Sequence, residues 1–244
     1  MNRRLHIIAC PSLRSDLLQL AAEVESQIAF RHLENGLHER PAHEMRQALQ
    51  TAIDQTTDCD AVVVAYGLCS RSVVGVTARD IPVVVPRAHD CIGLMLGSTQ
   101  RYLGEIASNP GTYFQSAGWL QAVRGGAQPR FTFGPNSNVT REKLAEQYGE
   151  EAADYLMEQF KGFTQHYERL AYIATPVADG PKWEAEARAI AAEQKWAFER
   201  LDADTGWMRR LLEGDWQESE FLVLEPGQTV VLTADERLIA AASQ

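Results

Sequence analysis

Side chains that could bind a metal follow directly on three short apolar runs of the sequence. The runs are 5–10, 61–66 and 81–85. The candidate ligands stand at the end of a run or at most six residues after it. These residues are Cys10, Cys69, His89, Asp90 and Cys91. If the runs are neighbouring parallel strands, their carboxyl ends share one edge of a sheet, where ligands of such sheets bind. The spacing therefore predicts a shared site.

Thiolates are soft ligands that suit zinc, copper(I) or iron–sulfur clusters. A structural zinc normally has four protein ligands, so three cysteines with an open fourth position are typical of a catalytic centre. A zinc ion held in this way would activate a bound thiol or water as a nucleophile. A [4Fe–4S] cluster held by three cysteines would leave one iron free for substrate. Zinc is the first expectation and the cluster the second.

The elements that must position these residues follow from hydrophobic periodicity. Strands are predicted at 5–10, 28–33, 61–66, 81–85, 169–175, 196–201, 221–224 and 229–232. Helices are predicted at 12–25, 41–55, 98–108, 140–167, 181–194 and 206–212, with a loop at 122–139. This alternation predicts an α/β fold with parallel sheets and right-handed crossovers, a Rossmann-like or flavodoxin-like three-layer architecture in two lobes.

Charge divides the chain unevenly. The 244 residues include 33 acidic and 23 basic side chains, a net charge of −10. Residues 1–135 hold 12 Arg, no Lys and 12 acidic residues, so the whole net negative charge lies in residues 136–244. We expect a cysteine-bearing lobe over 1–135, a long connecting helix within 136–168 and a smaller acidic lobe over 169–244.

The histidines leave several alternatives open. His89 or His38 could complete the metal coordination or act with Asp90 in acid–base chemistry. The competing interpretation is that the cysteines are only packed, because free Cys is among the most buried residue types. No Cys-x-x-Cys pair strengthens the metal interpretation. Cys59 precedes its strand, so it is expected at the opposite edge in a packing role.

Arginines near the expected site could hold an anionic substrate. Arg71, Arg87 and Arg101 each carry a planar fork that pairs with carboxylate or phosphate. Ser98 begins a predicted helix, where free backbone donors bind anions. The alternative for each arginine is an ion pair with a nearby carboxylate.

Composition and missing motifs exclude other functions. The acidic balance argues against nucleic acid and against an anionic membrane surface. No apolar stretch approaches the ~18 residues of a membrane span, and the N-terminus lacks the apolar core of a signal peptide. A cytoplasmic location with free or metal-bound thiols is expected. Walker A, Gly-x-Gly-x-x-Gly and Gly-x-Ser-x-Gly patterns are absent.

Several segments together resemble the prokaryotic family catalogued as domain of unknown function 1638 (DUF1638). They are Ala9-Cys10-x-x-Leu13-Arg14, Leu37-His38-x-x-Pro41, Tyr66-Gly67-Leu68-Cys69-Ser70, Pro86-Arg87-Ala88-His89-Asp90-Cys91-Ile92-x-Leu94-x-Leu96-Gly97-Ser98, Pro110-Gly111-Thr112-Tyr113 and Gly118-Trp119. Members often accompany corrinoid-dependent methyltransferase systems, so the resemblance implies one-carbon metabolism. The cysteines that match the pattern are Cys10, Cys69 and Cys91.

These observations lead to one expectation and its rivals. We expect a metal-thiolate enzyme, a transferase or lyase, that acts on a small anionic substrate by methyl transfer or related C–S or C–N chemistry. One rival is a [4Fe–4S] enzyme with an open iron site. Another is a non-catalytic metal or cofactor carrier, or an accessory protein of a corrinoid methyltransferase system. The expected partners are a small-molecule substrate and a corrinoid protein or methyltransferase.

Overall fold

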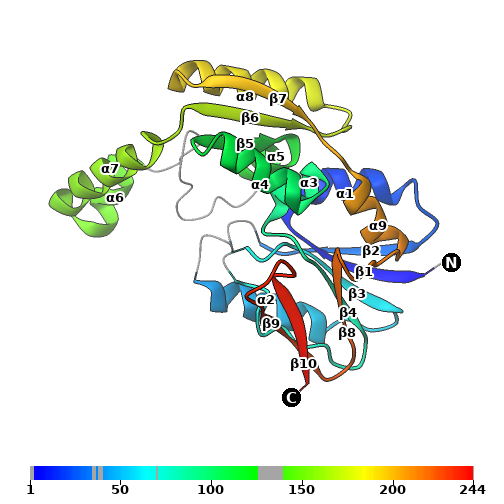
Figure 1. Ribbon diagram of the computed structural model, residues 1–244. Helices are drawn as coiled ribbons and strands as arrows, with labels where there is room; N and C mark the ends of the chain where they lie inside the picture. Colours follow the sequence, from blue (N-terminus) through cyan, green and yellow to red (C-terminus); the bar gives the residue numbers. More distant parts are fainter. Residues whose placement is uncertain (1–2, 35–36, 38–40, 70, 126–139, 244) are drawn as a thin grey trace.

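The computed structural model of the protein describes residues 3–34, 37, 41–69, 71–125 and 140–243 (Figure 1). Its strands are β1 (Arg4–Ala9), β2 (Gln27–His32), β3 (Ala61–Ala65), β4 (Val83–Pro86), β5 (Thr112–Ser116), β6 (Arg169–Ala174), β7 (Ala197–Asp202), β8 (Phe221–Leu224), β9 (Gln228–Leu232) and β10 (Ile239–Ser243). Its helices are η1 (Pro11–Leu13), α1 (Arg14–Ala21), α2 (Ala42–Asp54), α3 (Cys91–Leu96), α4 (Thr99–Ser108), α5 (Ala117–Gly125), α6 (Arg141–Tyr148), α7 (Glu150–Thr164), α8 (Gly180–Gln194) and α9 (Gly206–Glu213). None of the helices in these ranges combines the length and the apolar character needed to cross a membrane.

A five-stranded sheet organises the larger of two lobes. Its order is β2-β1-β3-β4-β8, with β8 antiparallel to β4 and the other pairs parallel. The chain passes from β1 to β2 on one side of it and then crosses to β3 on the other side, so the direction of strand order reverses between β1 and β3. In open α/β sheets, ligands bind at the carboxyl ends of the strands beside such a reversal. Cys10 and Cys69 follow these two strands.

Both faces of this sheet are covered, which explains why its central strands read as continuous apolar runs. Along β3, Ala61, Val63 and Ala65 face a core shared with α1, α3 and α9, whereas Val62 and Val64 face a core with α2. The β9–β10 hairpin packs on the α2 side. The α/β fold with parallel sheets that the sequence predicts is confirmed.

The smaller lobe is built on the parallel sheet β5-β6-β7. Leu120 of α5 and Ala187 of α8 pack with Leu170 on one face of that sheet. The opposite face turns toward the large lobe, where Ala171 and Ile173 join the core that contains β1 and α1. The two lobes therefore share a buried core rather than a thin linker.

The sheets divide the chain differently from the expected sequence of lobes. Segment 112–116 precedes the expected boundary at 135, yet it forms β5 of the small lobe. Segment 221–224 follows residue 169, yet it pairs with β4 in the large lobe. The chain therefore passes from the large lobe to the small one and returns. The physical reason is that β5 finds its hydrogen-bonding partner in β6 of the small lobe, and β8 finds its partner in β4 of the large lobe.

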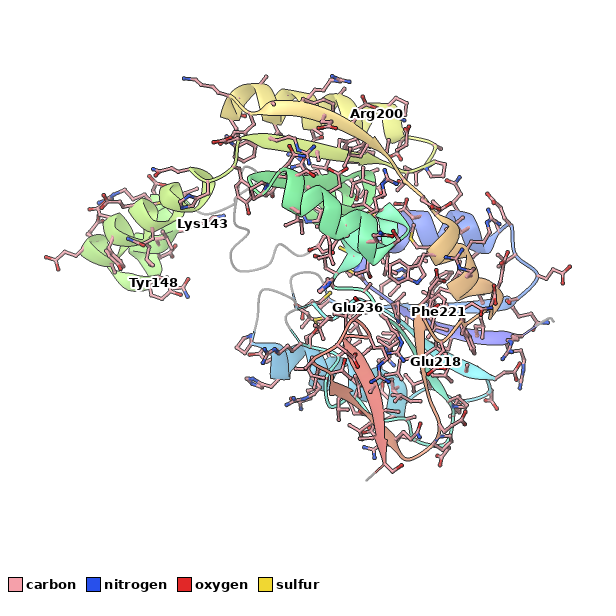
Figure 2. The ribbon with its side chains drawn as sticks, in the orientation of Figure 1. Lys143, Tyr148, Arg200, Glu218, Phe221 and Glu236 are labelled. Atoms are coloured by element: carbon pink, nitrogen blue, oxygen red, sulfur yellow. The ribbon has the colours of Figure 1, made fainter. Side chains whose placement is uncertain are left out.

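The expected long helix at 140–167 is two helices, α6 and α7, that form a hairpin. Gly149 separates them with φ of 86°, a left-handed value that an α-helix cannot contain. Figure 1 shows this hairpin projecting away from both sheets, and Figure 2 labels Lys143 and Tyr148 on it. The predicted strands at 221–224 and 229–232 do not pair with each other, because β9 pairs with β10 instead.

Candidate functional site

A cavity of about 320 Å³ lies between the two lobes. The large lobe contributes the residues that follow its strands, and the small lobe contributes the carboxyl ends of β5 and β6 with the first turn of α5. The lining residues are Cys10, Ser12, Tyr66, Cys69, His89, Asp90, Cys91, Ile92, Met95, Phe114, Gln115, Ser116, Trp119 and Ile173. The volume is at the lower end of the range for small-molecule sites. The cavity therefore matches a small ligand.

The close approach of two loops brings Cys69 beside Cys91. The backbone N–H of Leu68 donates to the carbonyl of Ala88 at 2.7 Å, and that of Cys69 donates to the carbonyl of His89 at 2.9 Å. Gly67 permits this contact, because a Cβ there would lie 2.6 Å from the backbone nitrogen of Asp90. The loops after β3 and β4 therefore continue side by side beyond the sheet.

The three predicted cysteines meet at the cavity. A hydrogen bond between the two thiols lowers the pKa of Cys10, which accepts it, and raises the pKa of Cys91, which donates it. The pair thus loses its first proton more readily than its second. Ser12 contributes a second contact, with 3.0 Å between its Oγ and the Cys10 Sγ.

The third thiol is held in an unusual backbone conformation. Cys69 has φ of 40°, in the left-handed region that costs a non-glycine residue free energy. Burial raises the pKa of its thiol well above the ordinary value, and the neighbouring Cys10 and Asp90 raise it further. Backbone hydrogen bonds from Gly67 and Cys91 act in the opposite direction. Cys69 is therefore a strained, protonated thiol beside the Cys10–Cys91 pair.

Asp90 positions the cluster. One carboxylate oxygen accepts from the backbone N–H groups of Ile92 at 2.9 Å and Gly93 at 3.2 Å, so Asp90 caps the helix that begins with Cys91. The other oxygen accepts from the hydroxyl of Tyr102 at 2.7 Å. These three hydrogen bonds occupy the carboxylate that the sequence offered for acid–base chemistry.

His89 lies at the cavity with its ring against Tyr102, at 5.7 Å between the ring centroids. The backbone carbonyl of His89 accepts a hydrogen bond from the backbone N–H of Cys69. The imidazole therefore stands on a rigid segment beside the thiols, where it could exchange a proton with a bound molecule.

Within the ranges that the structure describes, no three His, Cys, Asp or Glu side chains are already arranged around a single metal position. The Cys10–Cys91 hydrogen bond occupies the two sulfurs instead. Metal binding would therefore replace the proton between Cys10 and Cys91 and would require the thiol side chains to rearrange.

The structure places Arg87 and Arg101 away from the cavity lining. Arg87 is 6% exposed, and its guanidinium donates to the backbone carbonyls of Glu218 at 2.8 Å, Arg237 at 3.1 Å and Ile239. Figure 2 labels Glu218, whose carbonyl accepts one of these hydrogen bonds. Arg101 donates to the carbonyls of Leu96 at 3.2 Å and Asp202 at 2.7 Å. Both arginines tie chain segments together, and neither is positioned to hold a substrate in this cavity.

Arg71 and Ser98 also lie outside the lining. Arg71 is exposed with φ of 70°, and Ser98 caps α4 by accepting from the backbone N–H of Arg101. Cys59 lies at the opposite edge, as expected, beside a shallow cavity near His6. His38 lies outside the described residues, so its predicted role stays a prediction.

Sequence reasoning did not find the small-lobe side of the site. Phe114, Gln115, Ser116, Trp119 and Ile173 line the cavity together with the cysteines. A usable signal was present, because they lie at or near the carboxyl ends of parallel strands, where the rule applied to the large lobe also holds. The strand at 112–116 is too short and mixed in character to be recognised before the sheet is known.

Comparison with known proteins finds one family. A family model described as "Protein of unknown function (DUF1638)" matches residues 32–212. Comparison with curated proteins and with solved structures gives no significant match. The matched region includes Cys69, Cys91 and the small-lobe wall of the cavity, whereas Cys10 lies before it. The chain belongs to the DUF1638 family of proteins of unknown function.

Proposed function

We propose that the protein is a metal-thiolate enzyme that acts on a small molecule bound between its lobes. Cys10, Cys69 and Cys91 would hold the metal centre, with zinc as the first choice and a [4Fe–4S] cluster as the second. The observation that carries the proposal is the meeting of three thiols, each from the end of a different strand, at one cavity.

The chemistry of the donor set fits a soft metal. Three sulfurs supply the ligands that zinc and iron–sulfur clusters prefer. The hydrogen bond between Cys10 and Cys91 indicates that these two sulfurs already lie within reach of each other. A bound metal would replace their protons, and it would supply a Lewis acid for a thiol, water or substrate atom.

The chain's own residues would support the reaction from around the metal. His89 would accept or donate a proton at a substrate atom, because it lines the cavity beside the thiols. Asp90 would act as a positioning residue, since its carboxylate caps the helix that carries Cys91. Phe114 and Trp119 would exclude water from the small-lobe side.

The lined cavity supports an enzyme over a carrier. A carrier is expected to bury its metal under four protein ligands, whereas an enzyme needs room for substrate beside an open position. The anion-binding part of the expectation is not carried forward, because Arg87 and Arg101 bind carbonyls elsewhere and Arg71 is exposed outside the cavity lining. Methyl transfer with a corrinoid protein as partner remains a proposal that rests on the association of the family.

Metal analysis of the full-length protein purified without air tests the proposal. We expect about one zinc per chain, or iron and sulfide with visible absorption, in wild type. The Cys69→Ser, Cys91→Ser double variant should lose that metal. Cys59→Ser is the matched control, because Cys59 is a free cysteine at the opposite edge, and it should retain the metal. Wild type without stoichiometric metal, or a double variant that retains it, would contradict the proposal.

A further inference from the structure

Gln115 is a buried side chain whose amide is not satisfied by the protein. The residue is 1% exposed and contributes to the cavity wall at the carboxyl end of β5. Neither its Nε2 nor its Oε1 has a hydrogen-bond partner, and both atoms are shielded from solvent. Buried side-chain amides are nearly always hydrogen-bonded, so this exception calls for an explanation.

An unpaired donor and an unpaired acceptor on one planar group define the partner that would satisfy them. A ligand amide offers a carbonyl to Nε2 and an N–H to Oε1, so it matches Gln115 in both senses. A carboxylate offers acceptors alone, and an ammonium group offers donors alone. Either ion would leave half of the Gln115 amide unpaired.

The electrostatics of the cavity disfavour an anionic ligand group. Among the described lining residues there is no Arg or Lys to pair with an anion. The carboxylate of Asp90 accepts hydrogen bonds only from neutral donors, the N–H groups of Ile92 and Gly93 and the Tyr102 hydroxyl, so its negative charge at the lining further disfavours an anion. The other walls include Phe114 and Trp119, which suit an apolar or planar body.

We propose that Gln115 is a specificity-determining residue that recognises a carboxamide or secondary amide of the substrate. This inference rests on the proposed function, since it places the amide at the small-lobe wall and the reacting end of the substrate toward the three cysteines. The amide atoms are shielded in the structure, so the Gln115 side chain would have to rotate to bring them into contact with the ligand. A ligand without an amide would leave the buried polar atoms of Gln115 unpaired, so the site would select for ligands that carry one.

The test uses three small probes that share a phenyl ring and differ in their head groups: benzamide, benzoate and benzylammonium. Their binding to the full-length wild type is measured by ligand-observed NMR titration. We expect saturable binding of benzamide, at least about tenfold tighter than that of either ion, because only the amide pairs with both Gln115 atoms. The comparison needs no variant, so it decides the question even if a substitution at Gln115 prevents folding.

Variants then assign the effect to the residue. Gln115→Met preserves the volume and removes both hydrogen bonds, so benzamide should bind at least about tenfold more weakly. Gln121→Met is the control, because Gln121 also belongs to the small lobe but bonds Asp179 outside the cavity, and it should bind benzamide like wild type. Equal affinity in Gln115→Met, equal or tighter binding of an ion, or no saturable binding of benzamide would overturn the inference.

One further variant separates this inference from the proposed function. Cys69→Ser should lose metal and still bind benzamide, because the thiol and the amide lie on different walls. A Cys69→Ser, Cys91→Ser protein that keeps its metal refutes the metal proposal, while the benzamide titration still decides the role of Gln115. A protein with metal and no preference for benzamide refutes the inference about Gln115 alone.

Discussion

Replacing Asp16 by Asn should stabilise the protein at neutral pH. Asp16 lies in the first turn of α1, where the large lobe meets the small lobe, and it is 2% exposed. Thr175 is close by, yet neither carboxylate oxygen has a partner in hydrogen-bond geometry. Burial raises the pKa of Asp16 to about 6, an effect that the Thr175 hydroxyl opposes only in part.

The magnitude follows from the difference between the folded and unfolded pKa values. The ordinary value is 3.8 and the folded value is about 6, so ionisation is disfavoured in the fold by roughly 3 kcal/mol at ~1.36 kcal/mol per pKa unit. The unfolded chain releases this proton first as the pH rises. The contribution of the neutral carboxyl is therefore fully present below pH ~4, declines between pH ~4 and ~6, and is absent above that range.

Urea unfolding of wild type and Asp16→Asn at pH 4.5, 6, 7 and 8 measures this cost. We expect the variant to gain about 3 kcal/mol at pH 7 and 8, equivalent to about 6–12 °C in Tm, and the gain to shrink toward zero at acid pH. Asp58→Asn is the control, because Asp58 is exposed, and it should change stability little at any pH. An Asp16→Asn protein less stable than wild type at pH 8, or a gain independent of pH, would refute the reasoning.

Four other substitutions, of which Gly227→Ala is a control, test how the site and the lobe that carries it are held. Gly67→Ala should lower the free energy of unfolding by more than about 2 kcal/mol and reduce metal content, because its Cβ would meet the backbone of Asp90 at 2.6 Å. Gly227→Ala, whose φ is 85° in open space, should cost only about 1 kcal/mol and leave metal binding intact. Arg87→Met should cost about 2–4 kcal/mol in urea unfolding, since it leaves buried carbonyls unpaired, with metal content unchanged. Tyr102→Phe should cost about 1–2 kcal/mol through its lost bond to Asp90, and a thermal midpoint equal to that of wild type would exclude this.

The meeting of the three thiols could be predicted from the sequence because it depends only on which residues follow the apolar runs and on those runs being parallel neighbours. Each cysteine follows an apolar run, and the parallel arrangement of those runs places their ends at one edge whatever the exact register. The strand order observed, with a reversal between β1 and β3, is the order in which this rule applies most directly. Cys59, which precedes its strand, is likewise placed correctly at the other edge.

The arginines could not be placed in this way, because their partners are distant in sequence. Arg87 bonds carbonyls 131 to 152 positions further along the chain, and Arg101 bonds one that is 101 positions away. A guanidinium that satisfies backbone carbonyls looks, in sequence, the same as one that binds an anion. Pairing between distant segments also explains why the sequence does not predict that β5 belongs to the small lobe and β8 to the large lobe.

The return of the chain to the large lobe has a consequence for its synthesis. Val83–Pro86 is buried in the finished protein because Phe221–Leu224 pairs with it. During translation, the free edge of this apolar strand waits for more than half of the chain to emerge. Such an edge is a template for pairing with other chains. We therefore expect that chains ending before residue 221 aggregate, and that the nascent protein relies on chaperones until its last strands are released.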